Sequence, residues 1–238
     1  MLLLLAYFFL FFLSALIYIV LKSYLAEFER IFGIKRLFFK YTDVLMIFKA
    51  LPLVMAIIFS YFLKKQTSDV YIGIALALIF CFLGDFFIDR NLIQGMLFFA
   101  MAHVFLIISF LYSLSLHIGI LQTESFLLLI LLTLLIFIYD YMFVRYLTMI
   151  KMPKKYNTPI AIYSILISTM FASSMWLAFI SGIGELIILP LGAFLFLISD
   201  SMIAIREFRP KQISFSVTKI MGTYYLAIFL ISLSIIYI

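Results

Sequence analysis

Charged residues are scarce in this sequence of 238 residues: Asp, Glu, Lys and Arg make up only 12% of it. A soluble domain has about a quarter of its residues charged, whereas 67% of the residues here are hydrophobic. Such a chain could not cover its apolar surface in water, so the composition indicates a polytopic membrane protein. The net charge of +6 would suggest nucleic acid in a soluble protein. Here loop charge and anionic lipid headgroups explain it, and we expect no nucleic-acid partner.

Cysteine and histidine are also nearly absent. The single cysteine, Cys81, excludes an internal disulfide and any site built from several cysteines. Two histidines are too few for a histidine-rich zinc site, and the sequence has no Gly-x-Ser-x-Gly, Walker, HExxH or CxxC motif. We therefore expect no metal and no cofactor. The one alternative left open is a carboxylate metal site made by Asp85, Asp89 and Asp200.

Long apolar runs are abundant. A membrane-spanning helix needs about 20 mainly apolar residues, and helix is the state that satisfies the backbone in lipid. We expect an all-α, polytopic membrane helix bundle that forms one integral membrane domain over residues 1–238. The first run has no charged region before it and is too long for a signal peptide, so we interpret it as a retained span. About eight spans are predicted, at 2–21, 43–63, 70–88, 92–113, 125–146, 158–181, 185–205 and 213–237.

Lys and Arg are unevenly distributed over the connections between these spans. The even connections contain Lys64 and Lys65, and Lys49 and Lys219 lie inside spans. Positively charged loops stay in the cytoplasm. We therefore expect the odd connections inside and both termini outside, in an integral protein of a bacterial inner (cytoplasmic) membrane. The odd connections contain thirteen of the 17 basic residues: Lys22, Arg30, Lys35, Arg36, Lys40, Arg90, Arg145, Lys151, Lys154, Lys155, Arg206, Arg209 and Lys211.

Two stretches share one pattern: an aromatic-rich apolar run, a small residue, an aspartate and, five or six residues later, an arginine. They are residues 80–90, around Asp85, and residues 194–206, around Asp200. The two aspartates are 115 positions and four spans apart. That separation suits two parallel four-helix repeats, but the rest of the two halves is only weakly similar, so duplication stays open. Both aspartates precede an odd connection, so we expect a site toward the cytoplasmic face.

A charge inside a span is costly and marks a functional site by default. We therefore predict that Asp85 and Asp200 are catalytic carboxylates. The alternative is that each pairs with a nearby arginine among the lipid headgroups. Arg90, however, follows Asp85 by five residues, a poor spacing for a pair on one helix. For Asp89, one turn beyond Asp85, a surface position is the favoured interpretation.

Two lysines lie at the same predicted depth as the aspartates. Lys49 precedes Pro52, which would bend the helix and free a carbonyl, and Lys219 begins the last span. Each lysine could pair with a carboxylate or bind a phosphate, and each could equally extend to the interface. His103 lies near the middle of its span. We expect it inside the bundle, as a structural residue or as part of the site.

Three tyrosines begin spans on the predicted cytoplasmic side: Tyr163, Tyr224 and Tyr225. They are candidates for binding substrate or for tuning the aspartates, although tyrosines at this level are also ordinary membrane anchors. We interpret Asp140 and Arg145 as an interfacial pair among further tyrosines.

Several short motifs are similar to those of the YhhN-like lysoplasmalogenase family. The most specific is the approach to Asp200, in which Ser199 and Asp200 are followed by Ala204. The others are each weak alone but occur in the right order between residues 49 and 227: Lys49 with Pro52, Leu83-Gly84-Asp85, Ala102-His103, Tyr163 with Ile167-Ser168-Thr169-Met170, and Tyr224-Tyr225-Leu226-Ala227.

The resemblance implies an eight-helix membrane hydrolase. Its substrate would be a lysophospholipid with a vinyl ether, cleaved to a fatty aldehyde and glycerophosphoethanolamine or glycerophosphocholine. It also implies that Asp85 and Asp200 are needed for activity. The chemistry fits two carboxyl groups, because protonation of the vinyl ether carbon needs an acid and the addition of water needs a base. The residues do not decide which aspartate is the acid.

Two other functions remain open from the sequence. Intramembrane Asp and Lys residues also suit a proton-coupled transporter of small solutes. The shared depth of these charges near one face favours a one-sided pocket over a pathway across the membrane. A hydrolase of another lipid ether or of an epoxide could use the same scaffold. In each case the expected surroundings are membrane lipid.

Overall fold

The computed structural model describes residues 2–32, 36–63, 70–117, 123–150, 152–208 and 217–238. These residues form eight α-helices and three short 3-10 helices, η2 (Lys154–Tyr156), η3 (Gly184–Ile187) and η4 (Ser234–Ile236). The predicted all-α bundle is therefore confirmed. The α-helices are α1 (Leu2–Phe32), α2 (Arg36–Leu63), α3 (Val70–Ile88), α4 (Leu92–Ser115), α5 (Thr123–Met149), α6 (Asn157–Ile180), α7 (Ile188–Phe208) and α8 (Val217–Leu233).

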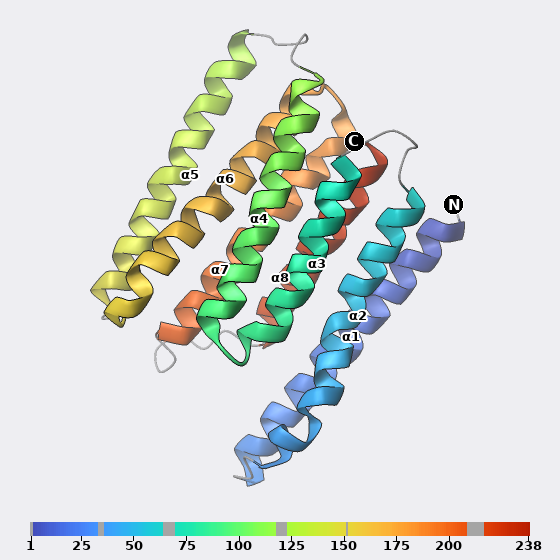
Figure 1. The fold of residues 1–238 in the computed structure, drawn as a ribbon, viewed down its shortest axis with the longest axis vertical. Coiled ribbons are helices and arrows are strands. Elements are labelled where there is room, and N and C mark those ends of the chain that lie inside the picture. Colours follow the sequence, from blue (N-terminus) through green and yellow to red (C-terminus); the bar gives the residue numbers. More distant parts are fainter. Residues whose placement is uncertain (1, 33–35, 64–69, 118–122, 151, 209–216) are drawn as a thin grey trace.

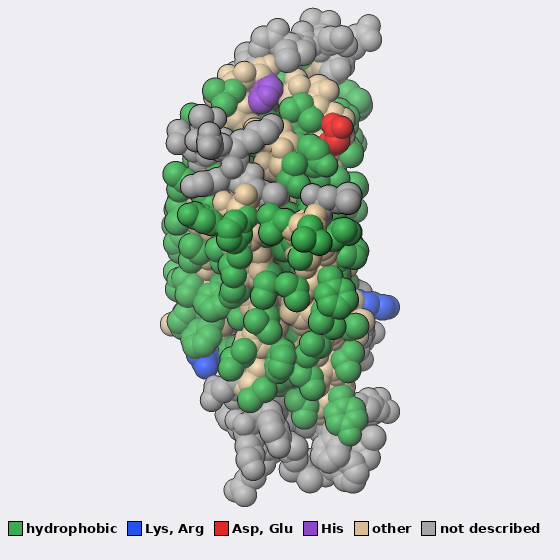
Figure 2. Space-filling model, turned by 90° about the vertical axis from the view of Figure 1, so that its right-hand side faces the viewer, with side chains coloured by type: hydrophobic (Ala, Val, Ile, Leu, Met, Phe, Trp, Pro, Cys, Tyr) green, Lys and Arg blue, Asp and Glu red, His purple; other side chains and the backbone are tan. Residues whose placement is uncertain are grey.

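All eight α-helices in the described part of the chain are long and apolar enough to cross a membrane. On the face shown in Figure 2, hydrophobic side chains form a continuous band, and the few charged side chains lie toward its margins. Lipid tails can solvate such a band and water cannot. The chain is an integral membrane protein.

The helices run alternately up and down. The last residues of α1, α3, α5 and α7 lie at one end of the bundle, with the first residues of the helices that follow them (Figure 1). We call this the lower end, as drawn. Both chain termini lie at the opposite end. The prediction placed the termini together, and the side of the membrane that each end faces stays a prediction.

The first two helices are longer than predicted. α1 continues to Phe32 instead of ending at residue 21, and α2 begins at Arg36 instead of residue 43. The prediction ended the first span at its first charge, Lys22. The Lys22 ammonium instead lies 3.5 Å from a carboxylate oxygen of Asp89. The apolar spans within these helices, Leu2–Leu25 and Val44–Phe62, agree with the predicted 2–21 and 43–63 to within a few residues. The first helix continues beyond its span because a charge with a partner across the bundle does not end a helix.

α3 and α4 form a tight hairpin at the lower end. The side chain of Asn91 caps α4 by accepting hydrogen bonds from the backbone N–H groups of Ile93 and Gln94, which otherwise lack partners at a helix start. Gly95 lies directly against Ile88, and a Cβ at position 95 would come within 2.5 Å of the Ile88 backbone. The hairpin fixes the end of α3, where Asp85 and Asp89 stand.

α7 and α8 also pack closely. A Cβ at Gly192 would lie 3.1 Å from the carbonyl oxygen of Ala227, and Ser199 donates a hydrogen bond to the carbonyl of Ile220 at 3.0 Å. Small residues permit such close approach of membrane helices. Asp200, next to Ser199, is held at this contact. The two aspartates thus stand on the third helix of each half of the chain, and the repeat hypothesis stays a prediction.

Candidate active site

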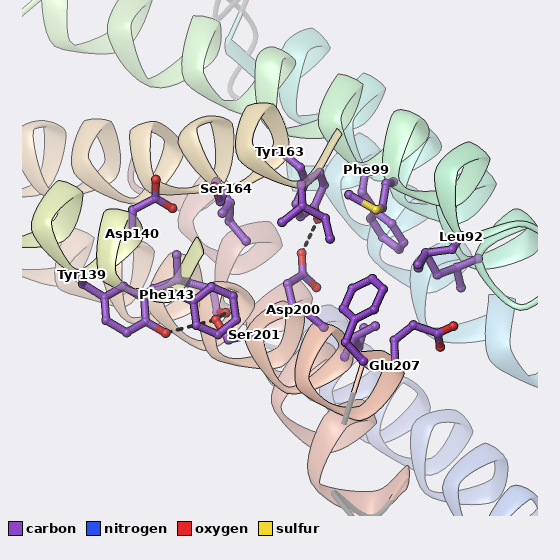
Figure 3. A pocket seen from close by; sticks show the side chains of 18 residues that line it. Leu92, Phe99, Tyr139, Asp140, Phe143, Tyr163, Ser164, Asp200, Ser201 and Glu207 are labelled. Atoms are coloured by element: carbon purple, nitrogen blue, oxygen red, sulfur yellow. Dashed lines mark hydrogen bonds between the residues drawn. The ribbon is translucent and has the colours of Figure 1, made fainter. Parts of the chain in front are cut away.

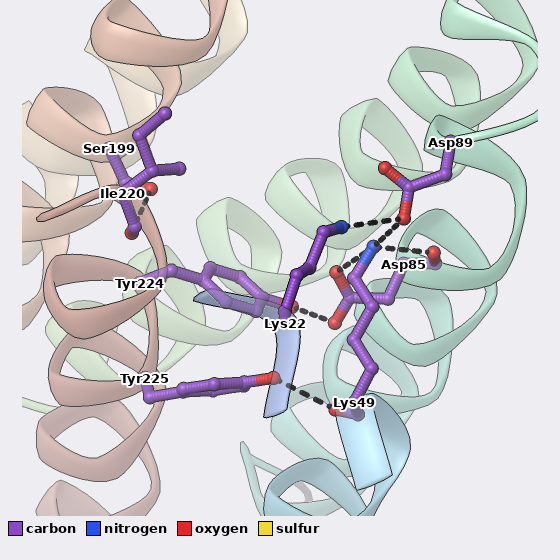
Figure 4. Close-up of polar contacts among 8 residues, drawn as sticks. All are labelled: Lys22, Lys49, Asp85, Asp89, Ser199, Ile220, Tyr224 and Tyr225. Atoms are coloured by element: carbon purple, nitrogen blue, oxygen red, sulfur yellow. Dashed lines mark hydrogen bonds and ion pairs between the residues drawn. The ribbon is translucent and has the colours of Figure 1, made fainter. Parts of the chain in front are cut away.

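Asp85 belongs to a network of charges at the lower end of α3 (Figure 4). The Lys49 ammonium, on α2, lies 3.5 Å from Asp85 Oδ1 and donates to the Asp85 carbonyl at 2.8 Å. It also donates to Asp89 Oδ2 at 3.0 Å. Lys49 and Asp85 are 3% and 5% exposed, so each needs the other as a counter-ion. The alternative in which Lys49 extends to the interface is wrong.

Two tyrosines of α8 complete this network. Tyr224 donates to Asp85 Oδ2 at 2.9 Å, and Tyr225 donates to the carbonyl oxygen of Lys49 at 3.1 Å. Both tyrosines are buried. They tie α8 to α3 and α2, and they are not the interfacial anchors that tyrosines at this level could have been.

Asp89 lies just beyond α3 and is more exposed than Asp85, at 39% of its side chain. Burial raises the pKa of Asp89, but Lys49 and Lys22 lower it by more, so that the pKa falls to about 2. Asp89 is therefore ionised at any physiological pH. The surface interpretation for Asp89 missed both lysines, because Lys22 comes from α1 and Lys49 from α2.

Asp200, on α7, has partners of its own. Tyr163 of α6 donates a short hydrogen bond to Asp200 Oδ2, and His103 of α4 lies with Nε2 3.1 Å from the Tyr163 hydroxyl. His103 Nε2 also lies 3.9 Å from Asp200 Oδ2, and Nδ1 has no hydrogen-bond partner among the described residues. His103, Tyr163 and Asp200 thus form a chain of polar contacts that ends at the Asp200 carboxylate.

Aromatic rings pack against partners of the two carboxylates. Phe196 packs edge-on against both His103 and Tyr224, with ring centroids 4.9 and 5.4 Å apart. Phe99 packs against Gly84, where a Cβ would come within 2.8 Å of its ring. The glycine before Asp85 thus admits the close approach of a neighbouring helix. The Phe196 ring thus contacts a partner of each aspartate: Tyr224, which binds Asp85, and His103, which lies beside Tyr163 and Asp200.

Asp85 and Asp200 line the same cavity, which we call the polar cavity. Its volume is about 510 Å³ and it lies at the lower end, where Asn91 and Val217 contribute to its wall. The cavity is rich in both signs of charge, so it can hold a zwitterionic or an anionic group. Its charged lining residues are Lys22, Lys49, Arg90, Lys155, Arg206, Asp85, Asp89, Asp200 and Glu207.

A second, narrow cavity of about 70 Å³ adjoins the polar cavity, and we call it the inner slot. Figure 3 shows its lining side chains, with Asp200 pointing to Tyr163 in the middle. Phe99, Asp200 and Glu207 line both spaces. The rest of the slot wall is mostly apolar, with Phe143, Ile167 and other hydrophobic side chains. Asp200 therefore stands where a charged space meets an apolar one.

Asp140 is the residue that the sequence interpretation placed wrongly. It is not an interfacial partner of Arg145: it is 7% exposed, faces α6 and accepts a hydrogen bond from Ser168 at 3.4 Å. It also lines the inner slot. The signal that could have found it is Ser164 and Ser168, one turn apart on the next helix, which present hydroxyls to a carboxylate.

The structure also tests the predictions for Lys219 and for a metal site. Lys219 is exposed on α8 and does not line the polar cavity, whose wall includes Ile220 and Tyr224 from that helix. Among the described residues, no three His, Cys, Asp or Glu side chains gather closely enough to hold a metal ion. The metal site of three aspartates does not form, because Asp200 stands apart from the pair on α3.

Comparison with known proteins adds one finding. No curated protein and no solved structure matches the chain. The sequence model of the YhhN family matches residues 44–235, a region that contains Asp85, Asp200 and all their hydrogen-bonding partners. Lys22 lies before it. Since the match covers well over half of the sequence, the chain belongs to the YhhN family.

Proposed function

We propose that this protein is a lysoplasmalogenase-like hydrolase, which cleaves the vinyl ether of an alkenyl lysophospholipid to a fatty aldehyde and a glycerophospho-base. The observation that carries the proposal is the position of the two aspartates. Asp85 and Asp200 line one polar cavity, and Asp200 also lines the apolar slot beside it. Membership of the YhhN family, which is associated with lysoplasmalogenase, supports the same reaction.

A lysophospholipid suits the two spaces. Its phosphate would lie among the cations of the polar cavity, where Arg90, Lys155 and Arg206 line the wall in addition to the two lysines near Asp89. Guanidinium groups bind phosphate oxygens in pairs. The vinyl ether, between headgroup and chain, would then lie near Asp200. We place this site at the cytoplasmic face, following the charge of the connections.

The contacts suggest a division of roles. Asp85 has Lys49 as its counter-ion, so we assign it as the base, in the ionised form. Asp200 stands at the border of the apolar slot, so we assign it as the acid that protonates the β-carbon of the vinyl ether. Tyr163 holds the other oxygen of Asp200 in place. Two carboxyl groups share acid and base work in this way in glycosidases.

The proton transfers balance over one cycle. Asp200 gives its proton to the β-carbon, and an oxocarbenium ion forms. Water adds to the carbon bonded to oxygen and gives a proton to Asp85, which leaves a hemiacetal. The hemiacetal then collapses: its hydroxyl proton returns to Asp200, the carbon–oxygen bond breaks, and Asp85 gives its proton to the leaving glycerol oxygen. One water is consumed, and both aspartates return to their starting forms.

Substitution of each aspartate tests the proposal. We expect Asp85→Asn and Asp200→Asn to fold, bind lysolipid and lower aldehyde release by about 10²–10⁴-fold, the usual contribution of general acid–base groups. The measurement is aldehyde formation by the purified protein on alkenyl, alkyl and acyl lysolipids. Glu185→Gln, an exposed acidic residue on η3, is the matched control. Full activity in either aspartate variant, or solute transport in liposomes without lipid turnover, would reverse the assignment.

A further inference from the structure

The inner slot does not end at Asp200. Above it, toward the middle of the bundle, a third space of about 370 Å³ lies between α5, α6 and α7, and we call it the outer groove. Tyr139 and Leu197 line both the slot and the groove. The remaining wall of the groove is hydrophobic, with Leu135, Met175 and Phe194 among its residues. The three spaces thus lie side by side, from the polar cavity, past Asp200, to an apolar space facing the membrane.

The junction of slot and groove is narrow. Tyr139, on α5, lies with its hydroxyl 3.2 Å from the Ser201 hydroxyl on α7, and Figure 3 shows this bond between the two side chains. The Tyr139 ring stacks on Phe143 with centroids 6.0 Å apart. α5 is the least buried of the eight helices in the described part of the chain. Tyr139 therefore bridges two helices that otherwise leave a gap between them.

We propose that the inner slot and outer groove are the binding site for the single hydrocarbon chain of the substrate, and that Tyr139 at their junction selects its length. This rests on the proposed function, since it takes the lysolipid headgroup to lie in the polar cavity. The order of the three spaces identifies the occupant: a molecule charged at one end and apolar at the other matches a charged cavity followed by an apolar slot and groove. Ordinary membrane lipid carries two chains, and the slot of about 70 Å³ is too small for two chains side by side.

A binding experiment tests the site without depending on turnover. The probe is an alkyl-ether lysophospholipid, which has no vinyl ether to cleave, with a photoreactive diazirine at the end of its chain. After irradiation of the purified protein, we expect modified peptides from the inward-facing side of the outer groove, at Ile136, Met175 or Leu197. An excess of unlabelled lysolipid should prevent the labelling, and an excess of diacyl phospholipid should not. Labelling confined to lipid-facing residues such as Leu191, or equal competition by diacyl lipid, would overturn the proposal.

Variants at the junction test selection by length. Tyr139→Trp should lower labelling by the long-chain probe about tenfold, the scale of a steric change in an apolar pocket. A short-chain probe, whose chain ends before the junction, should be unaffected. The matched control is Tyr141→Trp, two residues along α5, where the side chain is 66% exposed. Equal effects of the two variants would remove Tyr139 from chain selection.

The two proposals fail separately. Wild-type protein that is labelled in the groove and releases no aldehyde would disprove the hydrolase and leave the chain site in place. Wild-type protein that releases aldehyde and is labelled only on its lipid-facing surface would keep the hydrolase and disprove the chain site.

Discussion

Lys49 joins more of the site than any side chain around it. Its ammonium contacts both Asp85 and Asp89, and its backbone carbonyl accepts from Tyr225. A buried ion pair adds little net stability compared with apolar residues, but removal of one partner leaves a buried charge alone. The Lys49 side chain is therefore required mainly because Asp85 is present.

We expect Lys49→Met to lower the free energy of unfolding by about 3–5 kcal/mol, the usual effect of breaking a buried pair. Thermal and denaturant unfolding in detergent would measure the loss. Lys219→Met is the control, because Lys219 is exposed, and it should change stability by less than about 1 kcal/mol. The double variant Lys49→Met with Asp85→Asn should recover part of the stability. A lack of any such recovery would argue against the pairing.

The lowered pKa of Asp89 predicts that the protein loses stability in acid. Its folded pKa, lowered to about 2 by Lys49 and Lys22 against the effect of burial, lies below the value of about 4 expected when unfolded. Its contribution is therefore complete above about pH 4 and disappears as the pH falls to about 2. Unfolding in detergent between pH 2 and 6 should show wild type more stable than Asp89→Asn at pH 6, with the difference closing by pH 2. A difference that persists at pH 2 would contradict this.

Residue type and depth were enough to identify Asp85, Asp200 and Lys49 as site candidates from the sequence. A charge in a long apolar run has few explanations. The hydrogen-bonding partners of these residues could not be predicted from the sequence in the same way. Tyr224 contacts Asp85 across 139 positions, and no local spacing encodes such a contact. The misplacement of Asp140 has the same cause, since its partners stand on another helix.

Among the helices, α5 differs from the others in being the least buried in the described part of the chain. It packs along α6, and two polar contacts join the pair: Ser168 to Asp140 at 3.4 Å and Trp176 to Thr133 at 2.9 Å. Hydrophobic burial does not hold helices together in lipid, so hydrogen bonds and close packing must do so. These contacts fix one wall of the inner slot.

A double-mutant cycle on Asp140 and Ser168 tests this role. We expect Asp140→Leu and Ser168→Ala each to destabilise the protein and to be coupled by about 0.6 kcal/mol, the average for interhelical hydrogen bonds in membranes. The readout is the free energy of unfolding in detergent, with hydrogen exchange of α5 as a local measure. Tyr141→Leu, on the lipid-facing side of α5, should leave both unchanged. Additive effects at Asp140 and Ser168 would mean that this bond does not join the helices.

The helix ends show which boundaries the sequence can predict. Start and end points of α3 were predicted correctly at 70–88, because polar residues flank an apolar run on both sides. For α1 and α2 the predicted spans agree with the apolar spans of the structure, but the helices themselves continue beyond these spans at the lower end. A helix boundary set by tertiary partners cannot be found from hydropathy alone.

For the whole molecule, composition predicted the class, and the lengths of the apolar runs predicted the number of spans, because each helix that crosses a membrane needs about 20 such residues. The alternation of helices then brings every odd connection to one end. What hydropathy could not predict is how the polar cavity, inner slot and outer groove lie next to one another, because their walls take side chains from α1 to α8. That arrangement is the basis for treating the substrate as a single-chain amphiphile.

The central claim is that an aspartate protonates the β-carbon of a vinyl ether. The most direct test is turnover of an alkenyl lysophospholipid by the purified protein in D₂O, with mass analysis of the trapped aldehyde. The account predicts one deuterium per aldehyde, on the carbon next to the carbonyl, and no aldehyde from Asp200→Asn beyond the background rate. Aldehyde released without deuterium at that carbon would contradict it.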